Sequence, residues 1–278
     1  MTRAALITLN SSDDPVSNFA ETVSFLTEAA DGGADIILTP EVTNCISTDR
    51  THQRAVLQLE ADDRTLAAIR EFAKLRRVWV LIGSLALKTN DPDGRFANRS
   101  FLISPDGEIA AKYDKAHMFD VSVSASESYR ESAGYRSGNR AVLARTPLGS
   151  IGLSICYDVR FAYLYRSLAQ AGADILTVPS AFSAVTGAAH WEVLLRARAI
   201  ETGSFVFAPA QTGAHREKNT TKRQTYGHSL AVSPWGEVLF DGGTEVGVGF
   251  VDFNLSAVQD ARSRIPSLTH DQTLEVPR

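Results

Sequence analysis

The stretch GADIILTPE, residues 33–41, decides the fold class of this chain. It runs from a glycine through an apolar segment to a proline and a carboxylate, which is typical of a buried β-strand that ends in a loop. Before it, an Asp-Pro pair precedes apolar side chains at helical spacing, at Val16, Phe19, Val23, Leu26 and Ala30. A helix that is connected through a glycine to a buried strand is the repeating unit of α/β proteins, so we expect an α/β fold.

The same pattern returns at residues 172–180, GADILTVPS, where an apolar run again stops at a proline. Two interpretations remain open. Connections from a helix through a glycine to a strand can acquire such similar short sequences independently. Alternatively, the chain can hold two pseudo-equivalent halves within one sandwich.

Helix and strand patterns alternate through the rest of the chain. Helices are predicted over residues 62–76, 162–171, 191–201 and 255–264, and strands over residues 4–9, 78–87, 99–103, 108–113, 141–144, 151–155, 205–210, 228–233, 237–240 and 248–252. The span 115–140 is predicted to be rich in loops. No proline- or serine-rich linker divides the chain, so we expect one domain over residues 1–266 and a polar tail over residues 267–278.

Composition excludes several classes of function. Of the 278 residues 44% are apolar and 22% are charged, which permits a full core, and the net charge of −4 argues against nucleic-acid binding. No segment approaches the length of a membrane span, and the N-terminal apolar run is too short for a secretion signal. With only two cysteines a disulfide framework is not expected, and a reducing cytoplasm is the predicted location.

Reactive side chains follow several of the predicted strands, at Glu41, Lys115, Cys156 and Ser180. In an α/β sheet, catalytic and binding residues usually lie at the carboxyl ends of the strands. A nucleophilic cysteine needs a group that removes its proton and a donor for the oxyanion, and a desolvated glutamate and lysine can supply both. A lone cysteine at a strand end is nevertheless more often inert packing, so the segment IGLSICYDVR (residues 151–160) by itself favours an inert Cys156.

Other site types find little support in the sequence. There is no Gly-x-Ser-x-Gly elbow, phosphate-binding loop or dinucleotide fingerprint. The six histidines are scattered without metal-ligand spacing, so we expect no metal and no cofactor.

Three segments together resemble the signatures of the nitrilase (carbon–nitrogen hydrolase) superfamily: LTPE at 38–41, YDKAHMFD at 113–120 and GLSICYDVRF at 152–161. The segments AHWEVLLRARAIET (189–202) and YGHSLAVSPWGEV (226–238) are similar to its Nit branch. The resemblance implies an αββα sandwich that dimerises into a four-layer stack. It also implies a catalytic triad of Glu41, Lys115 and Cys156, with Glu131 of YRES as a second glutamate beside it.

The resemblance further implies an amidase reaction that needs no cofactor. Glu41 would deprotonate Cys156, Lys115 and the Tyr157 backbone N–H would hold the oxyanion, and a thioester would form with release of ammonia. Because Glu41 must transfer protons in both directions, we expect its pKa to lie nearer neutrality than that of a surface glutamate. For substrate binding, Arg160 is the candidate for a carboxylate, and Phe182 and Thr186 are candidates in a loop over the site.

The sequence does not identify the acyl group of the substrate. The Nit branch contains amidases of deaminated glutathione and ω-amidases of small dicarboxylate monoamides, and the segments at 187–202 and 211–218 resemble the former more closely. An N-carbamoyl-amine hydrolase, a non-catalytic binding protein and a glutaminase domain are alternatives. Three departures concern substrate detail and dimer contacts: Ala116, Ala188 and the form of the C-terminal tail.

Overall fold

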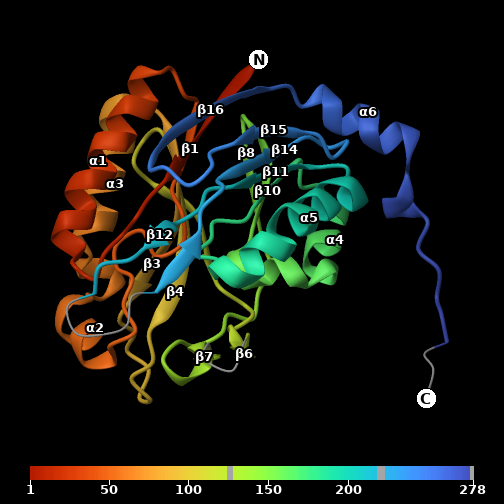
Figure 1. The fold of residues 1–278 in the computed structure, drawn as a ribbon. Helices are drawn as coiled ribbons and strands as arrows, with labels where there is room; N and C mark the ends of the chain where they lie inside the picture. Colours follow the sequence, from red (N-terminus) through yellow and green to blue (C-terminus); the bar gives the residue numbers. More distant parts are fainter. Residues whose placement is uncertain (124–127, 218–222, 276–278) are drawn as a thin grey trace.

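The computed structural model, which describes residues 1–123, 128–217 and 223–275, contains two six-stranded sheets between layers of helices (Figure 1). The first sheet has the order β16-β1-β2-β3-β4-β5. Its strands are β1 (Thr2–Thr8), β2 (Ile36–Leu38), β3 (Trp79–Leu87), β4 (Ala97–Ile103), β5 (Ile109–Asp114) and β16 (Gly247–Phe253). The second sheet has the order β15-β14-β11-β10-β9-β8. Its strands are β8 (Val142–Thr146), β9 (Gly149–Leu153), β10 (Ile175–Thr177), β11 (Phe205–Ala208), β14 (Leu230–Val232) and β15 (Val238–Asp241).

The two sheets repeat one topology. In each, three parallel strands (β1–β3, and β9–β11) are followed by two antiparallel strands and flanked on the other side by one more antiparallel strand. The two Gly-Ala-Asp-Ile (GADI) segments, residues 33–36 and 172–175, lead into β2 and β10. These are the middle strands of the two parallel sets. The repeated topology agrees with two pseudo-equivalent halves rather than with two short sequences that became similar independently.

Helices cover the outer face of each sheet, on opposite sides of the molecule (Figure 1). They are α1 (Pro15–Asp31) and α3 (Arg64–Arg76) on the first sheet, and α4 (Ala162–Gln170) and α5 (Ala184–Thr202) on the second. The other two helices are α2 (Arg50–Val56) and α6 (Ser256–Arg264). The start of α1 follows from its sequence, because the Asp14 carboxylate accepts from two backbone N–H groups and a proline opens the helix.

Strand alternation divides the core into layers. Along β1, Ala4 and Leu6 point into the core between the sheets, whereas Ala5 and Ile7 point into the core beneath α1 and α3. A sheet buried on both faces in this way is the inner layer of an αββα sandwich. The expectation of this fold is therefore confirmed.

The structure also corrects several predicted boundaries. Helix α5 begins at Ala184, seven residues before the predicted start, because the helical pattern from Trp191 onward obscured a first turn containing valine, threonine and glycine. Strand β9 ends at Leu153 rather than Ile155. Helix α2 and two short strand pairs were not predicted: β6 (Asp120–Ser122) with β7 (Ser128–Arg130), and β12 (Thr212–Ala214) with β13 (Gln224–Tyr226).

The segment after Pro266 lies against α4. Arg166 donates to the Ser267 carbonyl at 2.9 Å, and Gln170 donates to the Leu268 carbonyl at 3.0 Å. Among the described residues, no helix combines the length and the apolar character needed to cross a membrane.

Candidate active site

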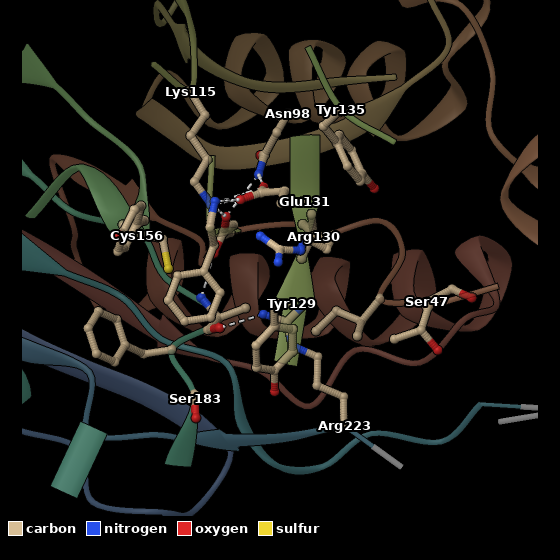
Figure 2. A pocket seen from close by; sticks show the side chains of 18 of the residues that line it. Ser47, Asn98, Lys115, Tyr129, Arg130, Glu131, Tyr135, Cys156, Ser183 and Arg223 are labelled. Atoms are coloured by element: carbon tan, nitrogen blue, oxygen red, sulfur yellow. Dashed lines mark hydrogen bonds and ion pairs between the residues drawn. The ribbon is translucent and has the colours of Figure 1, made fainter. Parts of the chain in front are cut away.

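Three of the residues predicted at strand ends converge at one edge of the sandwich. Lys115 directly follows β5, Glu41 lies three residues after β2, and Cys156 lies three residues after β9. The Lys115 Nζ atom is 2.9 Å from Glu41 Oε1, and Cys156 lies close enough to Glu41 that each group shifts the pKa of the other. Glu131 joins them, because its two carboxylate oxygens lie 3.1 and 2.9 Å from Lys115 Nζ (Figure 2). The structure thus brings together all four residues predicted as catalytic.

Gly83 of β3 allows the loops after β2 and β10 to meet. A Cβ atom at this position would lie 2.0 Å from the Thr39 carbonyl oxygen, 2.5 Å from the Pro40 carbonyl oxygen and 2.5 Å from the Pro179 side chain. Only glycine permits such an approach, so this residue fixes the path of the segment that carries Glu41.

Cys156 sits on a strained backbone. Its φ of 50° lies in the left-handed region, which is uncommon for a residue with a side chain, and its N–H donates to the Pro179 carbonyl at 3.0 Å. Cys156 opens the 3₁₀ helix η3 (Cys156–Arg160), of which Tyr157 is the second residue. Strained backbone at a reactive residue points to a functional constraint.

His117 has a structural role. Its ring lies 2.6 Å from Asp158 and 2.5 Å from the Tyr163 hydroxyl, and it stacks on Phe161 with ring centroids 3.6 Å apart. The buried Asp158 also accepts from the Ile155 N–H at 2.9 Å. This network joins the segment that carries Lys115 to the segment that carries Cys156.

The Glu41 carboxylate is fully engaged. Its Oε1 accepts from Lys115 and from Asn98 Nδ2 at 2.8 Å, and its Oε2 accepts from the Ala181 N–H at 2.8 Å. Burial raises the pKa of Glu41, but the Lys115 ammonium and, more weakly, Arg223 outweigh it and hold that pKa below its ordinary value. The expected pKa near neutrality is therefore wrong for the free protein, and Glu41 rests as a carboxylate.

The other two members of the triad also have defined resting states. Burial lowers the pKa of Lys115, but Glu131 and Glu41 raise it more, so the net pKa is well above the ordinary value and the side chain is an ammonium. Burial, with the Glu41 charge second, raises the pKa of Cys156, so the nucleophile rests as a neutral thiol. The site holds a thiol beside a carboxylate that can accept its proton.

The residues of the triad line a cavity of about 250 Å³. The predicted residues Tyr157 and Phe182 are also part of its lining, but Arg160 and Thr186 are not among the described residues that form it. The Arg160 guanidinium instead packs over the rings of Tyr157 and Phe182, at 5.9 and 5.6 Å from their centroids, and lies 3.3 Å from His190. Thr186 belongs to the first turns of α5 rather than to a loop, because that helix starts early.

Further residues of the cavity, above all Asn98 and Arg223, were not predicted from the sequence. Asn98 links the two glutamates, because its Nδ2 lies 2.8 Å from Glu41 and 3.4 Å from Glu131. The β4–β5 register contained a signal for it, since Asn98 lies opposite Lys115 across the hairpin, and the Lys115 N–H donates to the Asn98 carbonyl at 3.0 Å. Arg223 precedes β13, and no sequence pattern indicated it.

The described residues hold no group of three or more histidine, cysteine, aspartate and glutamate side chains placed to bind a metal ion. The chemistry that the geometry offers is that of a thiol nucleophile, a carboxylate base and an ammonium group.

Comparisons with known proteins point the same way. Residues 3–263 match the family model described as carbon-nitrogen hydrolase. The chain is 37% identical over 270 residues to a Synechocystis sp. (strain PCC 6803 / GT-S) protein named deaminated glutathione amidase, covering 96% of this chain and 97% of that protein. A Yersinia enterocolitica protein of the same name is 34% identical over 277 residues, covering 99% and 95%. The crystal structure of the C. elegans NitFhit protein superposes with a TM-score of 0.89 at 34% identity; the match covers 98% of this chain, which spans 65% of that longer protein.

Proposed function

The chain belongs to the carbon–nitrogen hydrolase family and hydrolyses amide C–N bonds, and on this premise we propose that Cys156, Glu41 and Lys115 carry out the reaction. The observation that carries the proposal is the buried array in which Lys115 Nζ contacts both glutamates at 2.9 Å, beside the Cys156 thiol. An uncompensated charge would be costly in such a site, and here each ionised side chain faces an opposite charge.

In the first half-reaction, Glu41 accepts the thiol proton and the Cys156 sulfur attacks the amide carbonyl carbon. Because the pKa of the thiol is raised and that of Glu41 is lowered, this transfer is uphill in the free enzyme. We therefore propose that it accompanies attack on the bound substrate. Lys115 and the Tyr157 backbone N–H stabilise the oxyanion, and such a donor contributes roughly 2.7–4 kcal/mol in other enzymes.

The proton that Glu41 received then passes to the amide nitrogen, the amine leaves and a thioester remains on Cys156, which completes the first half-reaction. In the second half-reaction, water attacks the thioester while Glu41 takes its proton. The C–S bond breaks, the acid product leaves, and the proton passes from Glu41 to the Cys156 thiolate. Glu131 keeps the Lys115 ammonium in place through its two contacts, and it lines the cavity where substrate and water bind.

The proposed substrate is deaminated glutathione or a similar carboxylated amide, which is supported by the names of the relatives that match nearly full length. A primary amide would release ammonia, in line with the expectation from the sequence. Deaminated glutathione is a secondary amide, so the leaving group there is an amine rather than ammonia. Small dicarboxylate monoamides are the nearest alternative, and carbon dioxide release would instead identify an N-carbamoyl substrate.

Trapping of the acyl-enzyme tests the proposal. We expect mass spectrometry of the protein quenched during turnover to find an acyl adduct on Cys156, and Cys156→Ala to lose both adduct and hydrolysis. Cys45→Ala is the matched control, since Cys45 is the other cysteine of the chain and is also buried. Turnover by Cys156→Ala at the wild-type rate, or an adduct on Cys45, would contradict the assignment.

We also propose that residues 1–266 form the catalytic domain, with residues 267–278 as a C-terminal tail, and that the enzyme is a homodimer. Exposed apolar side chains support a dimer surface on α4 and α5, where Tyr163, Val185, Val193 and Ile200 are all more than half exposed. A cytoplasmic location is proposed on the two free cysteines, and cell fractionation would test it.

A further inference from the structure

Arg223 is a cation of the cavity whose hydrogen-bonding capacity is only partly used. Its Nη2 atom donates to the Ala181 carbonyl at 2.8 Å, and its guanidinium lies over the ring of Tyr129 at 5.7 Å from the centroid (Figure 2). Its Nε atom is buried and finds no acceptor among the residues that the structure describes. A buried donor without a partner is costly, so a ligand that supplies the acceptor would be strongly favoured.

The other arginines of the cavity lining are placed differently. Arg50 donates from Nη1 to Gln53 at 3.0 Å and faces the Tyr135 ring. Arg130 is the last residue of β7 and is exposed. Arg223 is the one whose charge acts on the reacting groups: it lowers the pKa of Glu41, and Glu41 is the foremost of the anions that raise the pKa of Arg223.

A single residue connects Arg223 to the base. The N–H of Ala181 donates to Glu41 at 2.8 Å, and the C=O of Ala181 accepts from Arg223 at 2.8 Å. Arg223 is therefore held one residue away from the Glu41 contact, in the same cavity as Cys156.

We infer that Arg223 binds the free carboxylate on the acyl side of the substrate, and that it selects carboxylated amides over neutral ones. The guanidinium fork matches a carboxylate bidentately, and the unpartnered Nε supplies one of the two donors. The inference rests on the proposed amidase function and replaces Arg160, the candidate from the sequence, with a residue that lines the cavity.

Binding of that carboxylate would also prepare the base. The charged and polar groups around Glu41 are Lys115, Glu131, Cys156, Arg223 and Asn98. Neutralising Arg223 removes one of the cations that hold the pKa of Glu41 down, so Glu41 becomes a better proton acceptor when a carboxylated substrate is bound.

A pair of amides that differ at the end remote from the amide tests the inference: glutaramate, which ends in a carboxylate, and pentanamide, which ends in a methyl group. We expect wild type to prefer glutaramate by about a hundredfold in kcat/KM, and Arg223→Gln to lose about that factor on glutaramate but less than about threefold on pentanamide. Arg223→Lys should recover part of the loss, because it restores the charge without the fork. Arg160→Gln is the control and should leave the ratio of the two rates unchanged.

Two further readouts separate recognition from structure. In Arg223→Gln the acid limb of kcat/KM on pentanamide should move to higher pH, because the pKa of Glu41 rises when a cation is removed. In the Cys156→Ala background, calorimetry should show tighter binding of glutaramate than of pentanamide, and addition of Arg223→Gln should abolish the difference.

The outcomes distinguish this inference from the proposed function. Equal turnover of both amides by wild type, equal losses on both in Arg223→Gln, or loss of selectivity in Arg160→Gln would overturn the role of Arg223 while the amidase stands. A wild-type enzyme that hydrolyses no amide, deaminated glutathione included, would overturn the proposed function itself.

Discussion

Replacing Lys115 by methionine should destabilise the protein in a way that depends on pH. The ammonium makes three contacts with carboxylate oxygens, at 2.9 Å to Glu41 and at 3.1 and 2.9 Å to Glu131. The side chains of Lys115 and Glu41 are only 3% and 4% exposed. Removing one partner of a buried ion pair costs roughly 3–5 kcal/mol, because the remaining charge stays buried.

The expected loss lies near the lower end of that range. After the substitution Glu41 still accepts from Asn98 and Ala181, and Glu131 still accepts from the Phe119 N–H at 2.7 Å. We therefore expect a loss of about 3 kcal/mol in the free energy of unfolding at pH 8. For a chain of this size that corresponds to a fall in Tm of about 6–12 °C.

The sign of the pH dependence follows from the pKa of Glu41. In wild type that pKa is lowered, so its stabilisation is present above the pKa of the unfolded chain and is lost as the pH falls through the folded pKa. Without Lys115, burial dominates and raises the pKa of Glu41. The variant is then relatively more stable at low pH and loses stability as the pH rises through the raised pKa.

Urea unfolding of both proteins at pH 5 and pH 8 measures this difference. The destabilisation should be larger at pH 8 by at least about 1.4 kcal/mol, the equivalent of one pKa unit. Lys112→Met is the matched control: Lys112 is 3.1 Å from Glu60 but 54% exposed, so its loss should cost no more than about 1 kcal/mol. An equal cost of Lys115→Met at both pH values, or an equal effect of Lys112→Met, would refute the reasoning.

Two further predictions concern the scaffold and the assembly. Gly83→Ala should lower Tm by about 4–8 °C, equivalent to roughly 2 kcal/mol, and reduce kcat on deaminated glutathione, because the new Cβ would force the Glu41 loop away from Cys156. Gly94→Ala is the control, because its Cβ would meet open space; its φ of 67° adds a backbone strain that Gly83 lacks, so equal effects of the two would count against the steric argument. Val193→Glu, on the exposed face of α5, should convert a dimer to a monomer in sedimentation velocity, and a wild-type protein that sediments as a monomer would contradict the proposed dimer.

The fold was accessible from the sequence because its signals are local and occur twice. Each signal depends on neighbouring residues only: the GADI segments, the helix start at Asp14, and the alternation of side chains between the two faces of strands such as β1. The boundary of α5 was not accessible, since its first turns carry residues with weak helix propensity that are held by tertiary packing, as where Gly187 lies against Tyr226.

The active site could be predicted from the sequence only in part, for a different reason. Glu41, Lys115 and Cys156 follow strands, so sequence motifs could place them together. Arg160 is near Cys156 in the sequence, but a 3₁₀ helix turns its side chain onto aromatic rings instead of into the cavity. Arg223 reaches the cavity from a distant segment, and the pKa of Glu41 depends on that cation, so neither could be derived from local patterns.

The two halves repeat the same topology but carry different functional side chains. The site therefore requires both halves. Aligning the two GADI segments places Ser180 of the second half at the position of Glu41 in the first. The first half thus supplies the base and Lys115, and the second supplies Cys156, Ala181 and Arg223. The ionised groups Glu41, Glu131, Lys115 and Arg223 sum to zero charge beside the neutral Cys156 thiol. Transfer of the thiol proton to Glu41 keeps the total at zero, because Cys156 becomes the anion as Glu41 becomes neutral. Proton transfer within the buried site therefore creates no net charge, which lets a fully enclosed carboxylate act as a base.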